Sequence, residues 1–80
     1  MMKLTYDSRR NIGYLRFHEK TGEVDTIQLS DSLNVDIAPD GTIYGIELLN
    51  ANEQLRGENG GHFVIVNEAV GKAKDIALEI

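Results

Sequence analysis

The sequence of 80 residues contains no cysteine, and this absence excludes two ways of stabilising a small fold. Disulfide bonds and zinc sites with thiolate ligands both require cysteine. A chain of this length buries only about 60–65% of its unfolded surface, so a single hydrophobic core gives marginal stability. Association with further copies is the remaining common source of buried surface. We therefore expect one domain over residues 1–80 that forms a homo-oligomer, with a dimer as the expected state.

Basic clusters and long apolar runs are also missing. The sequence has eight Lys and Arg residues and 13 Asp and Glu residues, which gives a formal net charge of −5. Among the basic residues, only Arg9 and Arg10 are adjacent in the sequence. Proteins that bind nucleic acid directly carry a basic patch, so we do not expect that activity. No apolar run approaches the roughly 20 residues of a membrane span. No apolar segment typical of a signal peptide follows Lys3. These features predict a soluble, cytoplasmic protein.

Glycine-bearing turns are the most informative feature that is present. Residues 19–23, 38–42 and 68–72 carry Gly22, Gly41 and Gly71 between apolar runs of strand length. Glycine readily adopts the positive φ that a tight reversal requires. The three turns therefore predict hairpins, and with them a mainly β protein. We expect six or seven short strands in a small antiparallel sheet or meander, or in a partly closed barrel.

Alternation of polar and apolar residues places the first five strands. We expect them at residues 3–7, 12–18, 24–29, 33–38 and 42–49. After them, Asn50 or Asn52 is suited to cap a short helical turn near residues 50–57. Residues 57–61 include three glycines and predict a loop, which leaves residues 62–80 as a C-terminal segment.

The C-terminal segment fits two structures. A helical stripe is matched by Ala69, Ala73, Ile76, Ala77 and Ile80, whereas one face of a strand is matched by Ile76, Leu78 and Ile80. Residues 18–29 and 67–78 align without gaps and agree at four of twelve positions, including the glycine. Gly71 inside a helix would cost about 1 kcal/mol relative to alanine. We predict a second copy of a hairpin here, with a helix as the alternative.

Three acidic residues form the only cluster that suggests chemistry. Asp36, Asp40 and Glu47 lie in or beside the hairpin of Gly41, where they are candidates for a cation site or an acid–base pair. The alternative interpretation is that Asp40 shapes the turn while Asp36 and Glu47 face solvent. A calcium loop supplies about six oxygen ligands at defined spacing, which this segment lacks. We favour the structural interpretation and expect no metal or cofactor.

No other pattern indicates catalysis. A zinc site is not expected, because His18 and His62 lack a third ligand at suitable spacing. The loop of residues 57–61 lacks the lysine and the following Ser or Thr of a phosphate-binding loop. No serine lies in a nucleophile elbow. We therefore expect that the protein is not an enzyme.

Three tyrosines are the candidate partner interface. Tyr6, Tyr14 and Tyr44 each fall on an expected strand. On one exposed face they would form an aromatic patch suited to a protein partner. Alternatively, they close the rim of the core with their hydroxyl groups in water.

Residues 3–51 resemble the prokaryotic domain-of-unknown-function family 2283. The matching motifs are Lys3-Leu4-Thr5-Tyr6-Asp7, Tyr14-Leu15-Arg16-Phe17, Asp36, Asp40-Gly41 and Gly45-Ile46-Glu47-Leu48-Leu49-Asn50-Ala51. The resemblance implies a compact β-rich domain with no established activity, and an association with small toxin-like proteins. The chain departs from the family at residues 8–11, which lack acids, and at Gly13, where a larger apolar residue is usual.

Three functions follow as hypotheses. The favoured one is a non-enzymatic, oligomeric interaction module. The second is an acidic, antitoxin-like partner that binds a small basic protein, which the charge of −5 would help through electrostatic steering. The third is a weak metal-dependent activity at Asp36, Asp40 and Glu47.

Overall fold

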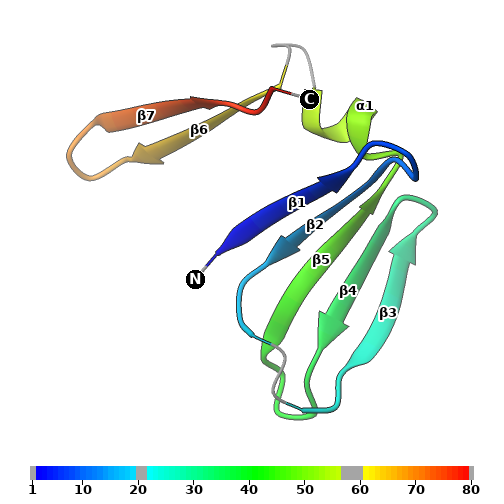
Figure 1. Cartoon of the computed structure of the whole chain (residues 1–80). Helices are drawn as coiled ribbons and strands as arrows, with labels where there is room; N and C mark the ends of the chain where they lie inside the picture. The colour runs from blue at the N-terminus through cyan, green and yellow to red at the C-terminus, as the bar shows by residue number, and fades with distance from the viewer. Residues whose placement is uncertain (1, 20–21, 57–60, 80) are drawn as a thin grey trace.

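A computed structural model describes residues 2–19, 22–56 and 61–79, which contain seven strands and one short helix (Figure 1). All the strand pairs are antiparallel, so the predicted mainly β fold is confirmed, and these residues form two open sheets without a closed barrel. The elements are β1 (Lys3–Asp7), β2 (Ile12–Arg16), β3 (Asp25–Ser30), β4 (Leu33–Ile37), β5 (Ile43–Leu49), α1 (Ala51–Arg56), β6 (His62–Asn67) and β7 (Lys72–Ala77).

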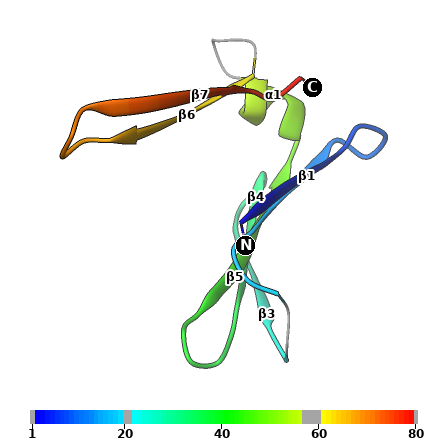
Figure 2. The same cartoon turned by 60° about the vertical axis from the view of Figure 1, so that its left-hand side comes forward.

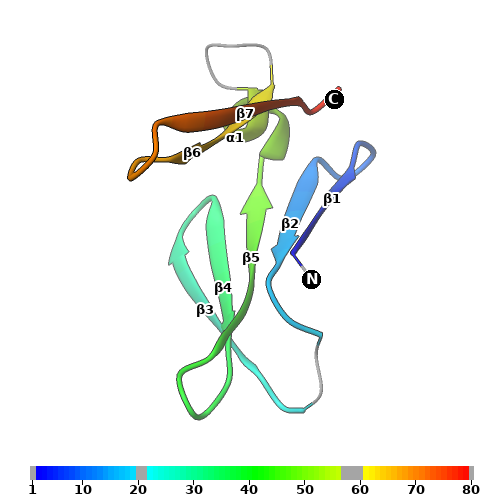
Figure 3. The same cartoon turned by 90° about the vertical axis from the view of Figure 1, so that its left-hand side faces the viewer.

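The first five strands form one sheet in the order β1-β2-β5-β4-β3. The prediction of a hairpin at Gly22 is wrong, because β2 and β3 lie on different sides of β5 and do not pair (Figure 3). Gly22 itself does not have the positive φ of a tight reversal. Lys20 and Thr21 of this expected turn lie outside the described residues. The sheet is consequently not a simple meander. The β1–β2 hairpin pairs with β5, the last strand of the β3–β4–β5 group, and not with β3.

The hairpin around Gly41 is confirmed. β4 and β5 pair on either side of it, and Gly41 has φ 92°. The Asp40 side chain accepts a hydrogen bond from the Thr42 backbone N–H at 2.9 Å, and Ala38 N donates to Thr42 O. The register shifts between Asp36 and Ile37, so that Tyr44 is an extra residue on β5. This β-bulge alters the facing of the β5 side chains near the turn.

The C-terminal hairpin is also confirmed, as β6 pairs with β7 in a separate two-stranded sheet. Its turn is related to the β1–β2 turn, which the sequence comparison did not identify. Asp7 and Asn67 each accept a hydrogen bond from the backbone N–H two residues later. Asn11 and Gly71, four residues after these, have φ 57° and 68°. Asparagine and glycine are the residues that tolerate this left-handed conformation best.

The predicted helical turn is observed as α1, and its N-terminus is capped both locally and from another part of the chain. The Asn11 Oδ1 atom accepts a hydrogen bond from Asn52 N at 2.8 Å, and Asn11 O accepts one from Ala51 N at 3.0 Å. Asn11 Nδ2 also donates to Asn52 Oδ1 at 2.7 Å. Asn52, one of the two predicted caps, accepts a hydrogen bond from the Glu53 N–H through Oδ1 at 2.9 Å. Asn11 supplies a second cap, which joins the β1–β2 turn to α1.

Gly13 allows α1 to lie close to the sheet. A Cβ at position 13 would stand 3.3 Å from both Ala51 Cβ and Leu55 Cδ1, which is tighter than ordinary van der Waals contact. Gly13 therefore marks the place where α1 packs on β2. Ala51 is the one hydrophobic residue of the described chain with no exposed surface.

The two faces of the five-stranded sheet differ in character. One face, called the apolar face, carries Leu4, Leu15, Ile46, Val35 and Ile27, which are paired in one row across all five strands. The other, called the polar face, carries Tyr14, Arg16, Glu47, Asp36 and Thr26. α1 covers the apolar face at β2, while Ile27 at the far edge remains 45% exposed.

The molecule is open. The β6–β7 hairpin projects away from the sheet on the side of α1 (Figures 1 and 2). Two backbone hydrogen bonds, Gly61 N to Arg56 O at 2.8 Å and Leu78 N to Gly61 O at 2.6 Å, hold its base beside α1. The Cα radius of gyration is 14.1 Å, against about 11.6 Å for a compact domain of this length. Within the described ranges, no helix has the length and apolar character to cross a membrane.

Candidate functional site

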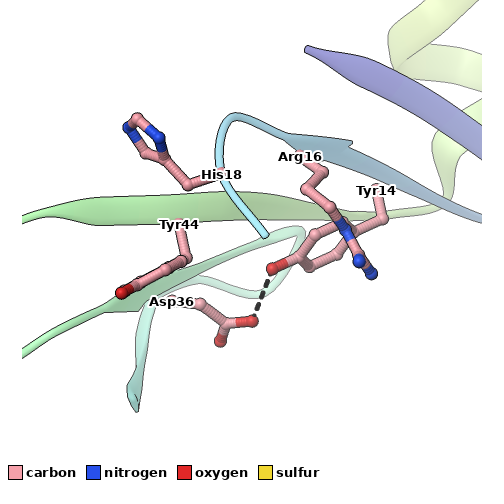
Figure 4. A pocket seen from close by; sticks show the side chains of 5 residues that line it. All are labelled: Tyr14, Arg16, His18, Asp36 and Tyr44. Carbon is pink, nitrogen blue, oxygen red and sulfur yellow. Dashed lines mark hydrogen bonds between the residues drawn. The ribbon is translucent and has the colours of Figure 1, made fainter. Parts of the chain in front are cut away.

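A hydrogen-bonded network crosses the polar face from β2 to β3. Tyr14 on β2 extends over Gly45 on β5, and its hydroxyl group donates to Asp36 Oδ2 on β4 at 2.7 Å (Figure 4). Thr26 on β3 donates from Oγ1 to Asp36 Oδ1 at 2.6 Å. Both carboxylate oxygens of Asp36 are thus engaged. The network links strands that are far apart in the sequence. It depends on the absence of a side chain at Gly45, because the Tyr14 ring occupies that space.

The same contacts change the acidity of Tyr14. Burial, followed by the hydrogen bond to Asp36 and the negative charge of that carboxylate, raises the pKa of the Tyr14 hydroxyl group from 10.0 to about 12. Each of these causes favours the neutral phenol over the phenolate. Tyr14 is therefore a hydrogen-bond donor at neutral pH and not a base. Its environment is the opposite of one that would activate a tyrosine for proton abstraction.

A shallow pocket of about 170 Å³ adjoins this network and is lined by Tyr14, Arg16, His18, Asp36 and Tyr44. The Arg16 guanidinium group lies 5.7 Å from the centre of the Tyr14 ring, and the ring of His18 meets Tyr44 edge-on with 6.1 Å between centroids. Figure 4 shows the Tyr14 hydroxyl group and Asp36 joined in this pocket. These contacts within the pocket are pairwise, with Arg16 over Tyr14, Tyr14 bonded to Asp36, and His18 against Tyr44.

The three acids predicted as a cluster are engaged separately. Asp36 binds Tyr14 and Thr26, whereas Glu47 Oε1 accepts a hydrogen bond from Asn34 Nδ2 at 2.9 Å. Asp40 accepts the Thr42 N–H in the turn, and this hydrogen bond lowers the pKa of its carboxyl group. Across residues 2–19, 22–56 and 61–79, no group of three potential metal ligands lies together. The hypothesis of a metal-dependent activity therefore has no geometric support at these acids.

The three tyrosines lie on different faces of the sheet. Tyr14 and Tyr44 both line the pocket on the polar face. Tyr6 pairs with Gly13 and lies on the opposite side, where its hydroxyl group donates to Asn11 Oδ1 at 3.3 Å. A single patch of three exposed tyrosines is therefore not formed, and all three side chains are partly buried. The predicted partner interface at Tyr6, Tyr14 and Tyr44 remains a prediction.

A larger apolar groove, which the sequence reasoning missed, separates the apolar face from the β6–β7 hairpin. Its volume is about 290 Å³, and it is lined by Met2, Leu4, Leu15, Leu48, Leu55, Phe63, Ile65, Ile76 and Leu78. Every one of these side chains is apolar. The signal in the sequence was the run Phe63-Val64-Ile65-Val66, because four consecutive apolar residues in a two-stranded hairpin leave both of its faces apolar.

The two faces of the hairpin have different surroundings. Phe63, Ile65 and Ile76 face the groove, where they remain 40%, 47% and 41% exposed. Val64 and Val66 lie on the opposite face and are 52% and 55% exposed. That outer face also carries a contact of His62 Nδ1 with Asp75 Oδ1 at 2.7 Å. Such a pair of polar side chains is typical of a solvent-facing surface, which leaves the groove as the candidate binding surface.

Comparison with known proteins gives one finding. A family model described as "Protein of unknown function (DUF2283)" matches residues 3–52, which is more than half of the chain and includes the complete five-stranded sheet. No curated protein and no solved structure matches the chain. The match ends at α1, so the β6–β7 hairpin lies outside the matched residues.

Proposed function

The chain belongs to this family of proteins of unknown function, DUF2283, and we propose that it acts as a non-enzymatic module that binds protein by self-association. The apolar groove is the binding surface in this proposal. The observation that carries the proposal is the large total surface of one chain, on which many large apolar side chains are exposed.

The surface area of the chain supports self-association. One chain exposes 6145 Å², whereas a compact monomer of 8.9 kDa exposes about 4,800 Å². The excess is about 1,300 Å². Since apolar burial is the dominant favourable contribution to folding, a chain with this excess and no cysteine gains most from burying surface against a partner.

The hairpin supports the proposal independently. All twelve residues of β6 and β7 are exposed, and the two strands are held by their ladder, by the contact between His62 and Asp75, and by the hydrogen bonds at the base of the hairpin. An isolated two-stranded hairpin is marginally stable in water, and three or more strands or packing against another element are needed for independent stability. Contact with a partner would supply that packing.

The arrangement of polar groups supports the non-enzymatic part of the proposal. Tyr14 is held neutral, its partner Asp36 accepts two hydrogen bonds, and Glu47 is bonded to Asn34. These residues serve the sheet by joining its strands. A cytoplasmic location is also part of the proposal, as the composition predicts.

Sedimentation equilibrium over a wide range of concentration tests the proposal. We expect a mass of twice the 8.9 kDa of one chain at micromolar concentration, with dissociation on dilution. A mass of one chain at every concentration up to the millimolar range would contradict self-association. The second hypothesis, an acidic partner for a small basic protein, stays a prediction. Co-purification with a basic protein from the native host would support it.

A further inference from the structure

The apolar face continues beyond the groove. Leu4 and Leu15 line the groove on β1 and β2, and their row extends through Ile46 and Val35 to Ile27. None of these five side chains is fully buried, and Ile27 is 45% exposed. The groove is therefore one end of a longer apolar surface that crosses the sheet.

The hairpin extends this surface in another direction. Its base, with Phe63 and Ile76, lies at the groove, while its tip projects away from the sheet (Figure 2). Ile65, which is directly paired with Lys74, stands between base and tip. One chain thus has two apolar arms that meet at the groove. One is the row from Leu4 to Ile27 across the sheet, and the other is the groove-facing side of the hairpin as far as Ile65.

We infer that a second copy of this chain fills the groove, with the β6–β7 hairpin of each copy lying across the apolar face of the other copy's five-stranded sheet. The inference rests on the proposed function and specifies the partner and the surfaces in contact. The arrangement is a symmetric dimer in which the same patch serves both chains, which is the commonest form of closed assembly. Each hairpin then covers the apolar face of the partner's sheet, and each sheet covers the groove-facing side of the partner's hairpin.

The surface area fits a single second copy. The excess of about 1,300 Å² per chain over a compact monomer lies within the range of about 1,000–2,500 Å² that each subunit buries in an obligate dimer. An interface of that size does not require a third subunit. It also accounts for the low burial in one chain, because the apolar core would form between the two copies.

Charges at the far ends of the two arms are complementary. Lys72 and Lys74 lie on the groove-facing side of the hairpin toward its tip, because they pair with Asn67 and Ile65. On the sheet, Asp25 lies on the apolar face beside Ile27, at the edge strand β3. A hairpin that crosses the partner's sheet toward β3 brings its lysines to this acid. Such pairs at the rim of an interface set the register of the partners.

Two substitutions on adjacent residues test the surface. Ile65→Lys places a charge on the groove-facing side of the hairpin, and Val64→Lys places the same charge on the outer side. The two residues have similar exposure, 47% and 52%, in one chain. We expect Ile65→Lys to raise the dimer dissociation constant by at least 100-fold and Val64→Lys to change it by less than 5-fold. Equal effects of the two substitutions would overturn the inference.

Nuclear Overhauser effects in a dimer of labelled and unlabelled chains identify the contacts directly. We expect intermolecular effects between the methyl groups of Ile65 on one chain and those of Val35 and Ile46 on the other. A dimer that shows intermolecular effects only elsewhere, such as between two β3 edges, would overturn the inference and leave the proposed self-association standing. A monomer in which Ile65 contacts its own sheet would overturn both.

Discussion

The ring of Tyr14 lies across the backbone of Gly45, so closely that a Cβ at position 45 would stand 2.5 Å from Tyr14 Cζ. Strand β2 is followed in the chain by β3, yet on the side away from β1 its neighbour in the sheet is β5. The Tyr14–Gly45 contact is specific to that neighbour, and it allows the Tyr14 hydroxyl group to reach Asp36 on β4. A glycine that is covered by an aromatic ring from the adjacent strand regains packing that it lacks by itself.

We predict that Gly45→Ala destabilises the fold by about 2–3 kcal/mol, because the added methyl group displaces the Tyr14 ring and breaks its hydrogen bond to Asp36. Urea denaturation measures the loss. Gly22→Ala is the matched control, since open space surrounds Gly22 and its φ is not positive. We expect no loss there. In a Tyr14→Ala background, Gly45→Ala should cost less than about 1 kcal/mol, and an unchanged cost would show that the clash lies elsewhere.

Tyr14 should titrate at about pH 12, against an ordinary value of 10.0. A variant with Tyr6→Phe and Tyr44→Phe leaves Tyr14 as the only tyrosine, so phenolate absorbance reports on it alone. Since the pKa in the folded state lies above that in the unfolded state, the contribution of Tyr14 to stability is complete below pH 10. It is lost as the pH rises through about 12.

Asp36→Asn should lower the pKa of Tyr14 but leave it above 10.0, because burial is the largest of the causes that raise it. The asparagine keeps an oxygen acceptor and removes the charge. Thr26→Val is a suitable control, since Thr26 bonds the other oxygen of Asp36 and not the oxygen that accepts the Tyr14 hydroxyl group. A Tyr14 pKa that stays at about 12 in Asp36→Asn would contradict the assigned role of Asp36.

Asn11 should contribute to stability in two separable ways. Asn11→Gly retains the positive φ of 57° but removes the side chain that caps α1, and we expect a loss of about 1 kcal/mol. Asn11→Ala removes the same side-chain contacts and also places alanine, which adopts the left-handed conformation less readily than asparagine or glycine, at this position. We therefore expect a further loss of about 1–2 kcal/mol. Thermal unfolding of both variants measures the difference. Equal stability of the two would show that the backbone of the β1–β2 turn is not strained.

The local features of this chain were predictable because they depend on neighbouring residues. The turn at Pro39, Asp40 and Gly41 is the one that these residue types favour, and Gly71 lies in the turn of a hairpin as predicted. Gly22 is also a glycine between two strands, but these strands, β2 and β3, lie on opposite sides of β5. Residue type indicates that the chain can reverse. It does not indicate which strand lies alongside afterwards, because that choice depends on contacts such as Tyr14 with Gly45.

The candidate site was harder to predict than the fold for the same reason. Asp36 and Tyr14 are 22 positions apart, and no local pattern joins them. Asn11 reads as a turn residue in the sequence, while its second role as the cap of α1 depends on a segment 41 positions away. The groove needs residues from both sheets. The sequence pattern indicates only the apolar run from Phe63 to Val66. It does not indicate which residues of the five-stranded sheet lie opposite that run.

Asp40 should make the fold sensitive to acid. The hydrogen bond from the Thr42 N–H stabilises its carboxylate and lowers its pKa from the ordinary value of 3.8. Its contribution to stability is therefore complete above pH 3.8 and is lost as the pH falls through the lower value of the folded state. A ¹³C titration of the carboxyl group measures the pKa. Asp40→Asn should remove this part of the acid sensitivity, and an unchanged acid transition in that variant would contradict it.

Hydrogen exchange should distinguish the two sheets by their dependence on concentration. Amide groups in the centre of β2 and β5 have strand partners on both sides and a hydrogen-bonded side-chain network above them, so we expect slow exchange that changes little on dilution. β6 and β7 have only each other, and all their side chains are exposed in one chain. If the hairpin is ordered by a second copy, its protection must fall as the dimer dissociates.

Comparing samples above and below the dissociation constant provides the measurement, and Ile65→Lys provides its control at constant concentration. In that variant the hairpin amides should exchange as fast at high concentration as the unsubstituted chain does when diluted, while β2 and β5 keep their protection. Strong protection of β6 and β7 in a dilute monomer would instead mean that the hairpin is stable without a partner, because an uncovered two-stranded ladder opens at low free-energy cost.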